Sequence, residues 1–256
     1  MSQHDIRSAR RPEPDQPMRD VADYVVDYRI DSDSAYETAR YMLLDSLGCA
    51  MLAMKFPECV KHLGPIVPGA TLDDGARVPG TSWQLDPVQA AYNIGVQVRW
   101  LDFNDTWLAA EWGHPSDNLG TILAVADYLS RRNARDGGEP LTIRDVLTAA
   151  IKAHEIQGCY ALQNSFNQIG MDHVILVRLA STAVATQLLG GSTTFSISST
   201  DSNIPISQGI PSITIGRGGK GGNAHSLLEW WLNDEGNRSI KWALLTLLAE
   251  GGIEMP

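Results

Sequence analysis

The sequence is short of several features that mark particular classes of protein. It has three cysteines among 256 residues, Cys49, Cys59 and Cys159, and they form neither a CxxC pair nor an even framework. That usage is typical of reduced thiols in the cytosol. No apolar run approaches the roughly 20 residues of a membrane span. The polar opening residues lack the apolar stretch of a secretory signal. We therefore expect a cytoplasmic protein that does not contact a membrane.

Positive charge is also scarce, because 20 Lys and Arg residues face 30 Asp and Glu residues, giving a formal net charge of −10. This balance argues against a surface that holds nucleic acid or anionic lipid through basic side chains. Hydrophobic residues make up 43% of the chain and charged residues 20%, which excludes disordered and coiled-coil compositions. The helical part contains neither the dinucleotide-binding glycine motif nor a Walker loop, and the glycine-rich loop at 216–222 is not followed by GK[ST]. Nucleotide binding is therefore not indicated. The remaining class is an acidic globular protein.

Apolar residues recur every three or four positions over much of 20–190, which is the period of an amphipathic helix. Polar residues that can cap a helix mark five expected starts. The first lies at Asp31, Ser32 or Asp33, and the others are at Asp86, Ser116, Thr142 and Asp172. Thr142 heads a capping box, and little of this stretch alternates with period two. The sequence therefore predicts a mobile tail over 1–19 and a helical domain over 20–190.

The composition changes near Gly190. Residues 192–214 are rich in serine and threonine, a short β-branched run occupies 212–215, and glycines fill 216–222. Such a run bounded by turn residues favours a strand, and a last helix is expected over 239–250. The expected fold class is therefore mainly α, with a short α/β fragment over 191–256 after the helical domain.

A cluster of reactive side chains interleaved with tryptophans lies between residues 100 and 116. Its members are Asp102, Asp105, Thr106, Glu111 and His114. Carboxylates and an imidazole beside apolar walls suit acid–base catalysis, because desolvation moves pKa values toward the working pH. The imidazole also precedes an expected helix N-terminus, where an anion could bind. The alternative interpretation is that the aspartates cap helices and the tryptophans belong to the core.

Two further histidines lie in the helical part. His173 stands at an expected helix start, a position that favours a neutral imidazole able to act as a base. His154 lies within an expected helix, where a single histidine is more often a packing residue. No HxxxH or HxxE pair occurs, so the helical part predicts no metal site.

Several segments resemble the MmgE/PrpD family of 2-methylcitrate dehydratases over about residues 18–189. The matching strings lie at 43–49, 64–69, 78–81, 85–91, 99–106, 111–118, 152–158 and 172–174. The resemblance implies a largely helical domain, a homodimer, and a reaction that uses neither a metal nor a redox cofactor. The implied reaction is the dehydration of 2-methylcitrate to 2-methylaconitate in the methylcitrate cycle of propionate catabolism.

The resemblance also implies roles for residues. Asp102, Thr106, His114 and His173 match positions that line the active site in the family. We expect His114 and His173 to transfer protons, Asp102 to orient or exchange a proton, and Thr106 to bind the substrate.

Three more residues are expected at the substrate-binding site, namely Asp105, Ser116 and Lys152. Lys152 is included because a tricarboxylate needs cations to offset its charge. Family chains are much longer, and their lysine-bearing helical segment and α/β lid are not recognisable after residue 190. We therefore expect weak or no activity from this chain by itself.

Residues 198–250 are similar instead to the end of the catalytic domain in dinuclear zinc peptidases of the aminoacylase/carboxypeptidase class. That resemblance implies an apparent chimera and would make His225 a zinc ligand. One histidine cannot build a two-metal site, and the family's other ligands have no counterpart upstream. Two alternatives to the lyase remain, a zinc-dependent peptidase or amidohydrolase and a catalytically inactive fusion.

Overall fold

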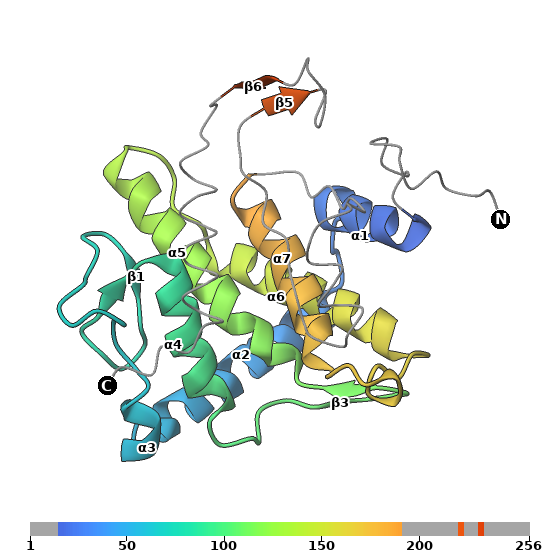
Figure 1. Cartoon of the computed structure of the whole chain (residues 1–256), viewed down its shortest axis with the longest axis horizontal. Helices are drawn as coiled ribbons and strands as arrows, with labels where there is room; N and C mark the ends of the chain where they lie inside the picture. Colours follow the sequence, from blue (N-terminus) through green and yellow to red (C-terminus); the bar gives the residue numbers. More distant parts are fainter. Residues whose placement is uncertain (1–14, 191–219, 223–229, 233–256) are drawn as a thin grey trace. The chain divides into compact units, whose positions relative to one another are not determined.

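The computed structural model describes residues 15–190, 220–222 and 230–232. Helices dominate the described residues, as the sequence predicted (Figure 1). The helices are α1 (Gln16–Asp27), α2 (Asp33–Ala53), α3 (Pro57–Val60), α4 (Pro87–Arg99), α5 (Leu119–Arg135), α6 (Ile143–Ala161) and α7 (Val174–Leu188), with 3-10 turns η1 (Pro115–Asn118) and η2 (Asn167–Ile169). The first helix begins at Gln16, inside the predicted tail.

The strands form short antiparallel pairs. In the helical part, β1 (Ala76–Arg77) pairs with β2 (Gln84–Leu85), and β3 (Trp107–Leu108) pairs with β4 (Trp112–Gly113). Beyond Gly190 the described residues are β5 (Lys220–Gly222) and β6 (Trp230–Leu232), which also pair. The expected strand at 212–215, the last helix and His225 lie outside the described residues.

Most of the expected helix starts are confirmed. The Ser32 hydroxyl accepts from Ala35 N at 3.3 Å, and the Thr142 capping box is present. Asp86 caps α4, and Asp172 Oδ1 accepts from Val174 N at 2.9 Å. Each of these contacts spans three residues or fewer along the chain, so local sequence determines them.

The prediction for Ser116 is wrong. This serine lies inside η1, which precedes α5, and α5 begins at Leu119 without a side-chain cap. The Ser116 backbone N–H donates instead to the Asp105 carboxylate, at 3.0 Å to Oδ1 and 3.2 Å to Oδ2. A carboxylate from an earlier loop thus caps the turn that Ser116 was expected to cap.

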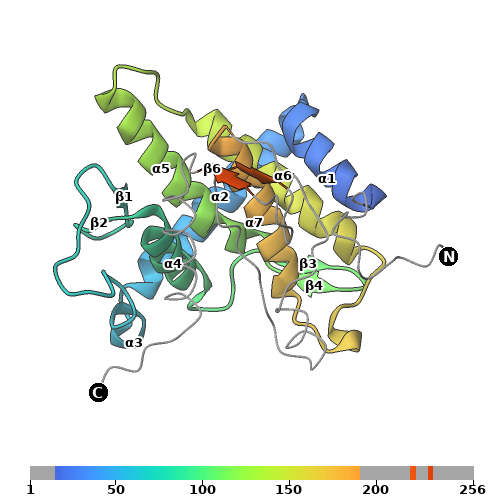
Figure 2. The same ribbon diagram turned by 45° about the horizontal axis from the view of Figure 1, so that its top comes forward.

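Two apolar clusters form the core. The larger one joins α1, α2, α5, α6 and α7, while the smaller one joins α2, α4, α5 and the β1–β2 pair. Leu123 of α5 packs against both clusters. Figure 2 shows α4, α5 and α7 crossing in front of α2. Among the described residues, no helix combines the length and apolar character that a membrane crossing requires.

Candidate functional site

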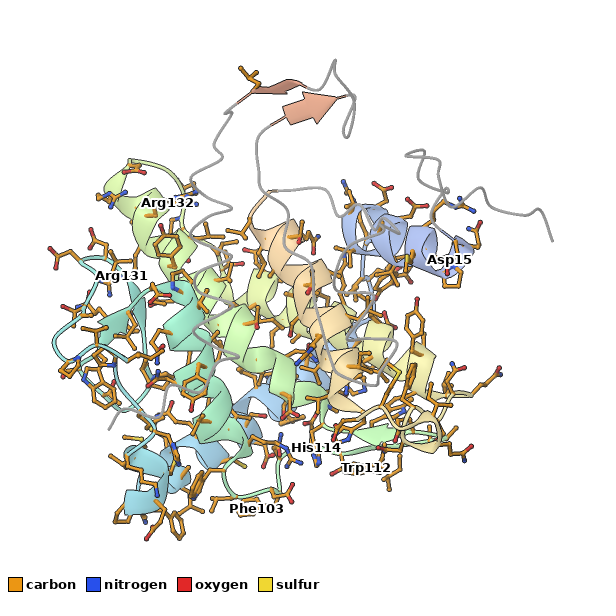
Figure 3. All side chains as sticks on the ribbon, viewed as in Figure 1. Asp15, Phe103, Trp112, His114, Arg131 and Arg132 are labelled. Carbon is orange, nitrogen blue, oxygen red and sulfur yellow. The ribbon has the colours of Figure 1, made fainter. Side chains whose placement is uncertain are left out.

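The β3–β4 hairpin brings two imidazoles to the same tryptophan. His114 follows β4 directly, and His173 directly precedes α7. The Trp112 ring centroid lies 4.0 Å from that of His173 and 6.0 Å from that of His114, and the two imidazole centroids are 6.4 Å apart. Figure 3 shows Trp112 and His114 side by side. The structure therefore brings both predicted proton-transfer residues together.

The protonation pattern of His114 follows from its partners. The ring is buried, and its Nδ1 lies 2.7 Å from the Asp105 backbone oxygen. A carbonyl oxygen can only accept, so Nδ1 donates and the neutral ring keeps a lone pair on Nε2. That Nε2 lies 3.9 Å from Asp102 Oδ1. The Nε2 atom is therefore the one that can take up a proton.

His173 is buried, and its ring packs against Trp112. Its Nδ1 lies 3.1 Å from Oδ1 of Asp172, the preceding residue. The interplanar angle of 36° with Trp112 lets the indole cover one face of the imidazole. A ring held in this way can deliver or receive a proton with little motion.

Asp102 lies on the open side of the cluster, with 73% of its side chain exposed. Its φ of 58° falls in the left-handed region, which aspartate tolerates better than most residues. The carboxylate forms an ion pair with the Arg99 guanidinium at the end of α4. The backbone bend and the ion pair together hold Asp102 near His114.

Asp105 is half-buried and Ser116 is buried, so neither side chain is exposed for direct contact with a substrate. The Asp105 carboxylate occupies the N-terminal end of η1, where the sequence suggested a site for a bound anion. The Ser116 side chain is fully buried and accepts from Asn104 Nδ2 at 2.8 Å. Thr106 is exposed beside them. Of the expected substrate-binding residues on this loop, Thr106 is the exposed one.

Lys152 does not join this cluster. Its side chain is buried, and Nζ donates to the Val25 backbone oxygen of α1 at 2.6 Å. Burial lowers the pKa of this lysine, while the Asp27 carboxylate opposes that shift. The direct substrate contact expected of Lys152 is therefore replaced by a structural bond between α6 and α1.

Three residues that the sequence reasoning did not select complete the cluster, namely Arg99, Asn104 and Asp117. Asn104 Nδ2 lies 3.2 Å from Asp117 Oδ1, and Arg99 Nε lies 3.7 Å from Asp117 Oδ2. Burial raises the pKa of Asp117, although Arg99 and Asn104 act in the opposite direction. The spacing of Arg99 and Asp102, three residues apart, was a usable signal for their ion pair.

Glu111 anchors the turn of the hairpin. Its buried carboxylate accepts from Asn167 N at 2.9 Å, Asn167 Nδ2 at 2.8 Å and Trp112 N at 3.2 Å. Burial alone would raise the pKa of Glu111, but these hydrogen bonds bring it below its ordinary value. Glu111 therefore fixes Trp112 against η2, and its carboxylate is not exposed to a substrate.

A chain of buried amides holds the cluster to the helices behind it. Asn118 Nδ2 donates to Gln157 Oε1 at 3.0 Å, and Ser181 donates to Asn118 Oδ1 at 2.7 Å. A Cβ at Gly113 would lie 2.8 Å from Gln157 Nε2, so only glycine fits there without displacement. This chain joins β4, η1, α6 and α7 around His114 and His173.

The other tryptophan of the hairpin packs away from this cluster, against α6. The Trp107 ring meets His154 edge-on at 5.4 Å, and a Cβ at Gly158 would lie 3.2 Å from the indole. Burial lowers the pKa of His154. These contacts agree with the interpretation of His154 as a packing residue.

The cluster supplies proton-transfer groups and no evident metal site. Over residues 15–190, no group of three or more His, Cys, Asp and Glu side chains is arranged to hold a metal ion. The available chemistry is a base at His114 Nε2, a second imidazole 6.4 Å away and a carboxylate at the open side. That combination suits proton removal from carbon and protonation of a leaving group.

The chain is similar to several known proteins. A family model described as the MmgE/PrpD N-terminal domain matches residues 19–201. A 2-methylcitrate dehydratase of Cupriavidus necator is 64% identical over 186 residues, covering 73% of this chain and 38% of that protein. The 2-methylcitrate dehydratase of Escherichia coli K12 is 64% identical over 180 residues, covering 70% of this chain and 37% of that protein.

A third relative matches beyond the helical part. The mitochondrial 2-methylcitrate dehydratase of Yarrowia lipolytica is 48% identical over 246 residues, covering 95% of this chain and 46% of that protein. This alignment continues past Gly190, into the segment for which a zinc-peptidase resemblance was expected. The chain spans less than half the length of each of these curated relatives.

Proposed function

This chain belongs to the MmgE/PrpD family, and on that premise we propose that it supplies the acid–base groups of a 2-methylcitrate dehydratase. The reaction is the loss of water from 2-methylcitrate to give 2-methylaconitate. The observation that carries the proposal is the pair of imidazoles 6.4 Å apart beside Trp112. The pair lies in a segment that matches proteins named 2-methylcitrate dehydratase at 64% identity.

The proposed elimination needs two proton transfers. A base removes a proton from the carbon next to a carboxylate, and the released electron pair forms the carbon–carbon double bond. The hydroxyl then leaves with a proton from an acid, as water. We assign His114 Nε2 as the base, because its other nitrogen is held as a donor by Asp105. His173, beside Asp172, is assigned as the acid.

The remaining site residues take supporting roles in the proposal. Asp102 orients His114 or exchanges its proton from 3.9 Å, and the exposed Thr106 hydroxyl binds the substrate. Asp105 and Ser116 position the imidazole through the start of η1. Lys152 bonds α6 to α1 and has no role at the site in this proposal.

The substrate carries three carboxylates, which need positive partners. Arg99 is the guanidinium beside His114's loop, and its charge already faces Asp102 and Asp117. Further cations must therefore come from groups other than these. We expect this chain by itself to bind and turn over 2-methylcitrate weakly.

The family also suggests a location, an oligomeric state and a domain organisation for this chain. We propose a cytoplasmic homodimer that acts on a small tricarboxylate and needs no metal or redox cofactor. We also propose a helical domain over 20–190, followed by a smaller segment over 191–256. The peptidase alternative gains no support, because His225 lies outside the described residues and the Yarrowia lipolytica alignment covers its segment.

The first test is a dehydration assay with the purified chain and 2-methylcitrate, monitored by the absorbance of the enoate product. We expect slow turnover that a chelator does not affect and that His114→Ala abolishes. Turnover unchanged in His114→Ala would overturn the assignment of the base. Zinc-dependent hydrolysis of an acylated amino acid would overturn the lyase.

A binding measurement covers the case in which turnover is too slow to detect. Histidine side-chain NMR signals are recorded while 2-methylcitrate is added, with His62→Gln as a control away from the cluster. We expect shifts at His114 and His173 and none at His154, whose ring packs on Trp107. Saturating 2-methylcitrate without a shift at either imidazole would contradict the proposal.

A further inference from the structure

A groove separate from the imidazole cluster lies between α1 and α6. Figure 2 shows α1 beside the yellow helix α6. The groove has a volume of about 560 Å³, within the range of sites for small molecules. None of the cluster residues lines it. Asp20 and Tyr24 of α1 line one side of the groove, together with Tyr28, the residue that follows α1. Glu155, Cys159 and Tyr160 of α6 line the other side.

The walls of the groove are aromatic. Tyr24 and Tyr28 stack with their ring centroids 5.2 Å apart and an interplanar angle of 27°. Tyr28 is 54% exposed, so its ring is open to a ligand. Tyr160 lines the groove from α6. The faces of phenol rings attract cations, and a set of such rings is a common way to hold an organic ammonium group.

The charges in the groove are negative. Glu155 accepts a hydrogen bond from the Tyr24 hydroxyl, and Asp20 lies one turn before Tyr24 on α1. The Glu155 side chain is exposed to solvent, and its partial burial raises the pKa of the carboxyl group. Within the part of the chain that the structure describes, no lysine or arginine lines the groove. The nearby Lys152 ammonium is buried and bonded to the Val25 backbone oxygen.

We propose that this groove binds a small organic cation, with its ammonium group beside Glu155 and the ring of Tyr28. The two carboxylates disfavour an anion such as the tricarboxylate substrate. A neutral apolar ligand would leave Glu155 further desolvated without a counter-charge, which costs free energy. A cation removes that cost and uses the aromatic walls at the same time. The inference does not rest on the proposed lyase activity.

Cys159 provides a reporter inside the groove. Its thiol is exposed, while Cys49 and Cys59 are buried. The rate at which iodoacetamide alkylates Cys159 is measured with and without benzyltrimethylammonium, a cation that carries an aromatic ring. Benzyl alcohol is the neutral comparison. We expect the cation to slow alkylation about threefold at millimolar concentration, and the alcohol to have little effect.

Substitutions of the groove carboxylates then show whether their charge, rather than the shape of the groove, accounts for binding of the cation. Asp20→Asn and Glu155→Gln should each weaken protection by the cation about two- to fivefold. The matched control is Asp23→Asn, which removes the same charge from α1 at a residue that does not line the groove. Far-UV circular dichroism checks that each variant keeps its helices. Asp20→Asn, on the first half of α1, remains informative if Glu155→Gln fails to fold.

Three outcomes would overturn the proposal. Equal protection by benzyl alcohol would show that the groove recognises only apolar surface. Protection by the cation that survives both Asp20→Asn and Glu155→Gln would show that the carboxylates do not bind it. Isothermal titration calorimetry with benzyltrimethylammonium measures binding without relying on the Cys159 thiol. If the cation produced neither binding heat nor protection of Cys159, the proposal would also be overturned.

Discussion

The core of the helical part and the loop that carries His114 are ordered by different forces. In the core, Ile122, Ala180 and Val184 have no exposed surface and contact other apolar side chains. Around His114, the buried side chains are polar and connected by hydrogen bonds, as in the pair formed by Asn104 and Ser116. Burial of apolar surface stabilises the core, whereas directional hydrogen bonds stabilise the loop.

The difference follows from what each region must do. An apolar core tolerates small shifts, because dispersion and hydrophobic burial have little directionality. A proton-transfer group must keep its ring plane and its free nitrogen in place, and hydrogen bonds specify both. The loop therefore depends on a few exact partners, and it should be more sensitive to polar substitutions than to loss of volume.

The largest expected effect is a cavity in the core. Ile122→Ala should lower the free energy of unfolding by about 2–5 kcal/mol, because Ile122 is completely buried in α5. Urea denaturation followed by circular dichroism measures the change. The control is Ile169→Ala, since Ile169 is 71% exposed and should cost less than about 0.5 kcal/mol. Equal costs at the two positions would contradict the assignment of the core.

The next effect is expected in the buried amide chain. Gln157→Leu should cost about 1–3 kcal/mol, because it leaves Asn118 Nδ2 without one of its acceptors. The substitution should also loosen the contact of Gln157 with Gly113 and broaden the NMR signals of His114 and His173. A stable variant whose histidine signals are unchanged would show that packing alone orders the loop.

A smaller effect is expected where Asp105 caps η1. Asp105→Ala should cost about 0.5–2 kcal/mol, because the Ser116 N–H loses its acceptor. Asp105→Asn keeps an acceptor oxygen and should restore most of the loss. Thermal unfolding of both variants measures the difference. If alanine and asparagine were equivalent, the cap would contribute nothing to stability.

The smallest effect depends on pH and concerns Glu111. Its pKa is lower in the folded state than in the unfolded state, so the ionised carboxylate stabilises the fold above its ordinary pKa. That contribution is lost as the pH falls through the folded-state value. Unfolding of wild type and Glu111→Gln is compared between neutral and acidic pH, and the difference should shrink in acid. A difference independent of pH would contradict the charged role of Glu111.

Local contacts account for what the sequence could predict. The caps at Ser32 and Thr142 use partners three residues away, so they are visible in the sequence. Ser116 was misassigned because its partner, Asp105, lies eleven residues earlier. Lys152 was misplaced because its partner, Val25, is 127 residues away. Patterns read in short windows cannot reveal such pairs.

The candidate site shows the same limit. The nearness of His114 and His173 depends on the packing of a hairpin against α7, and family resemblance rather than spacing suggested it. The left-handed backbone at Asp102 and the raised pKa of Asp117 also arise from tertiary structure. Residue types and motifs gave the chemistry of the cluster, while its geometry needed the fold.

The bond from Lys152 to Val25 has a consequence for how the chain folds during synthesis. Val25 lies in the last turn of α1, where a helix cannot satisfy its own carbonyl groups. The donor comes from a residue made 127 positions later. A helix of 12 residues is marginal by itself in water. On the ribosome, α1 should therefore remain unformed until α6 has emerged, so the first helix in the sequence is among the last to become stable.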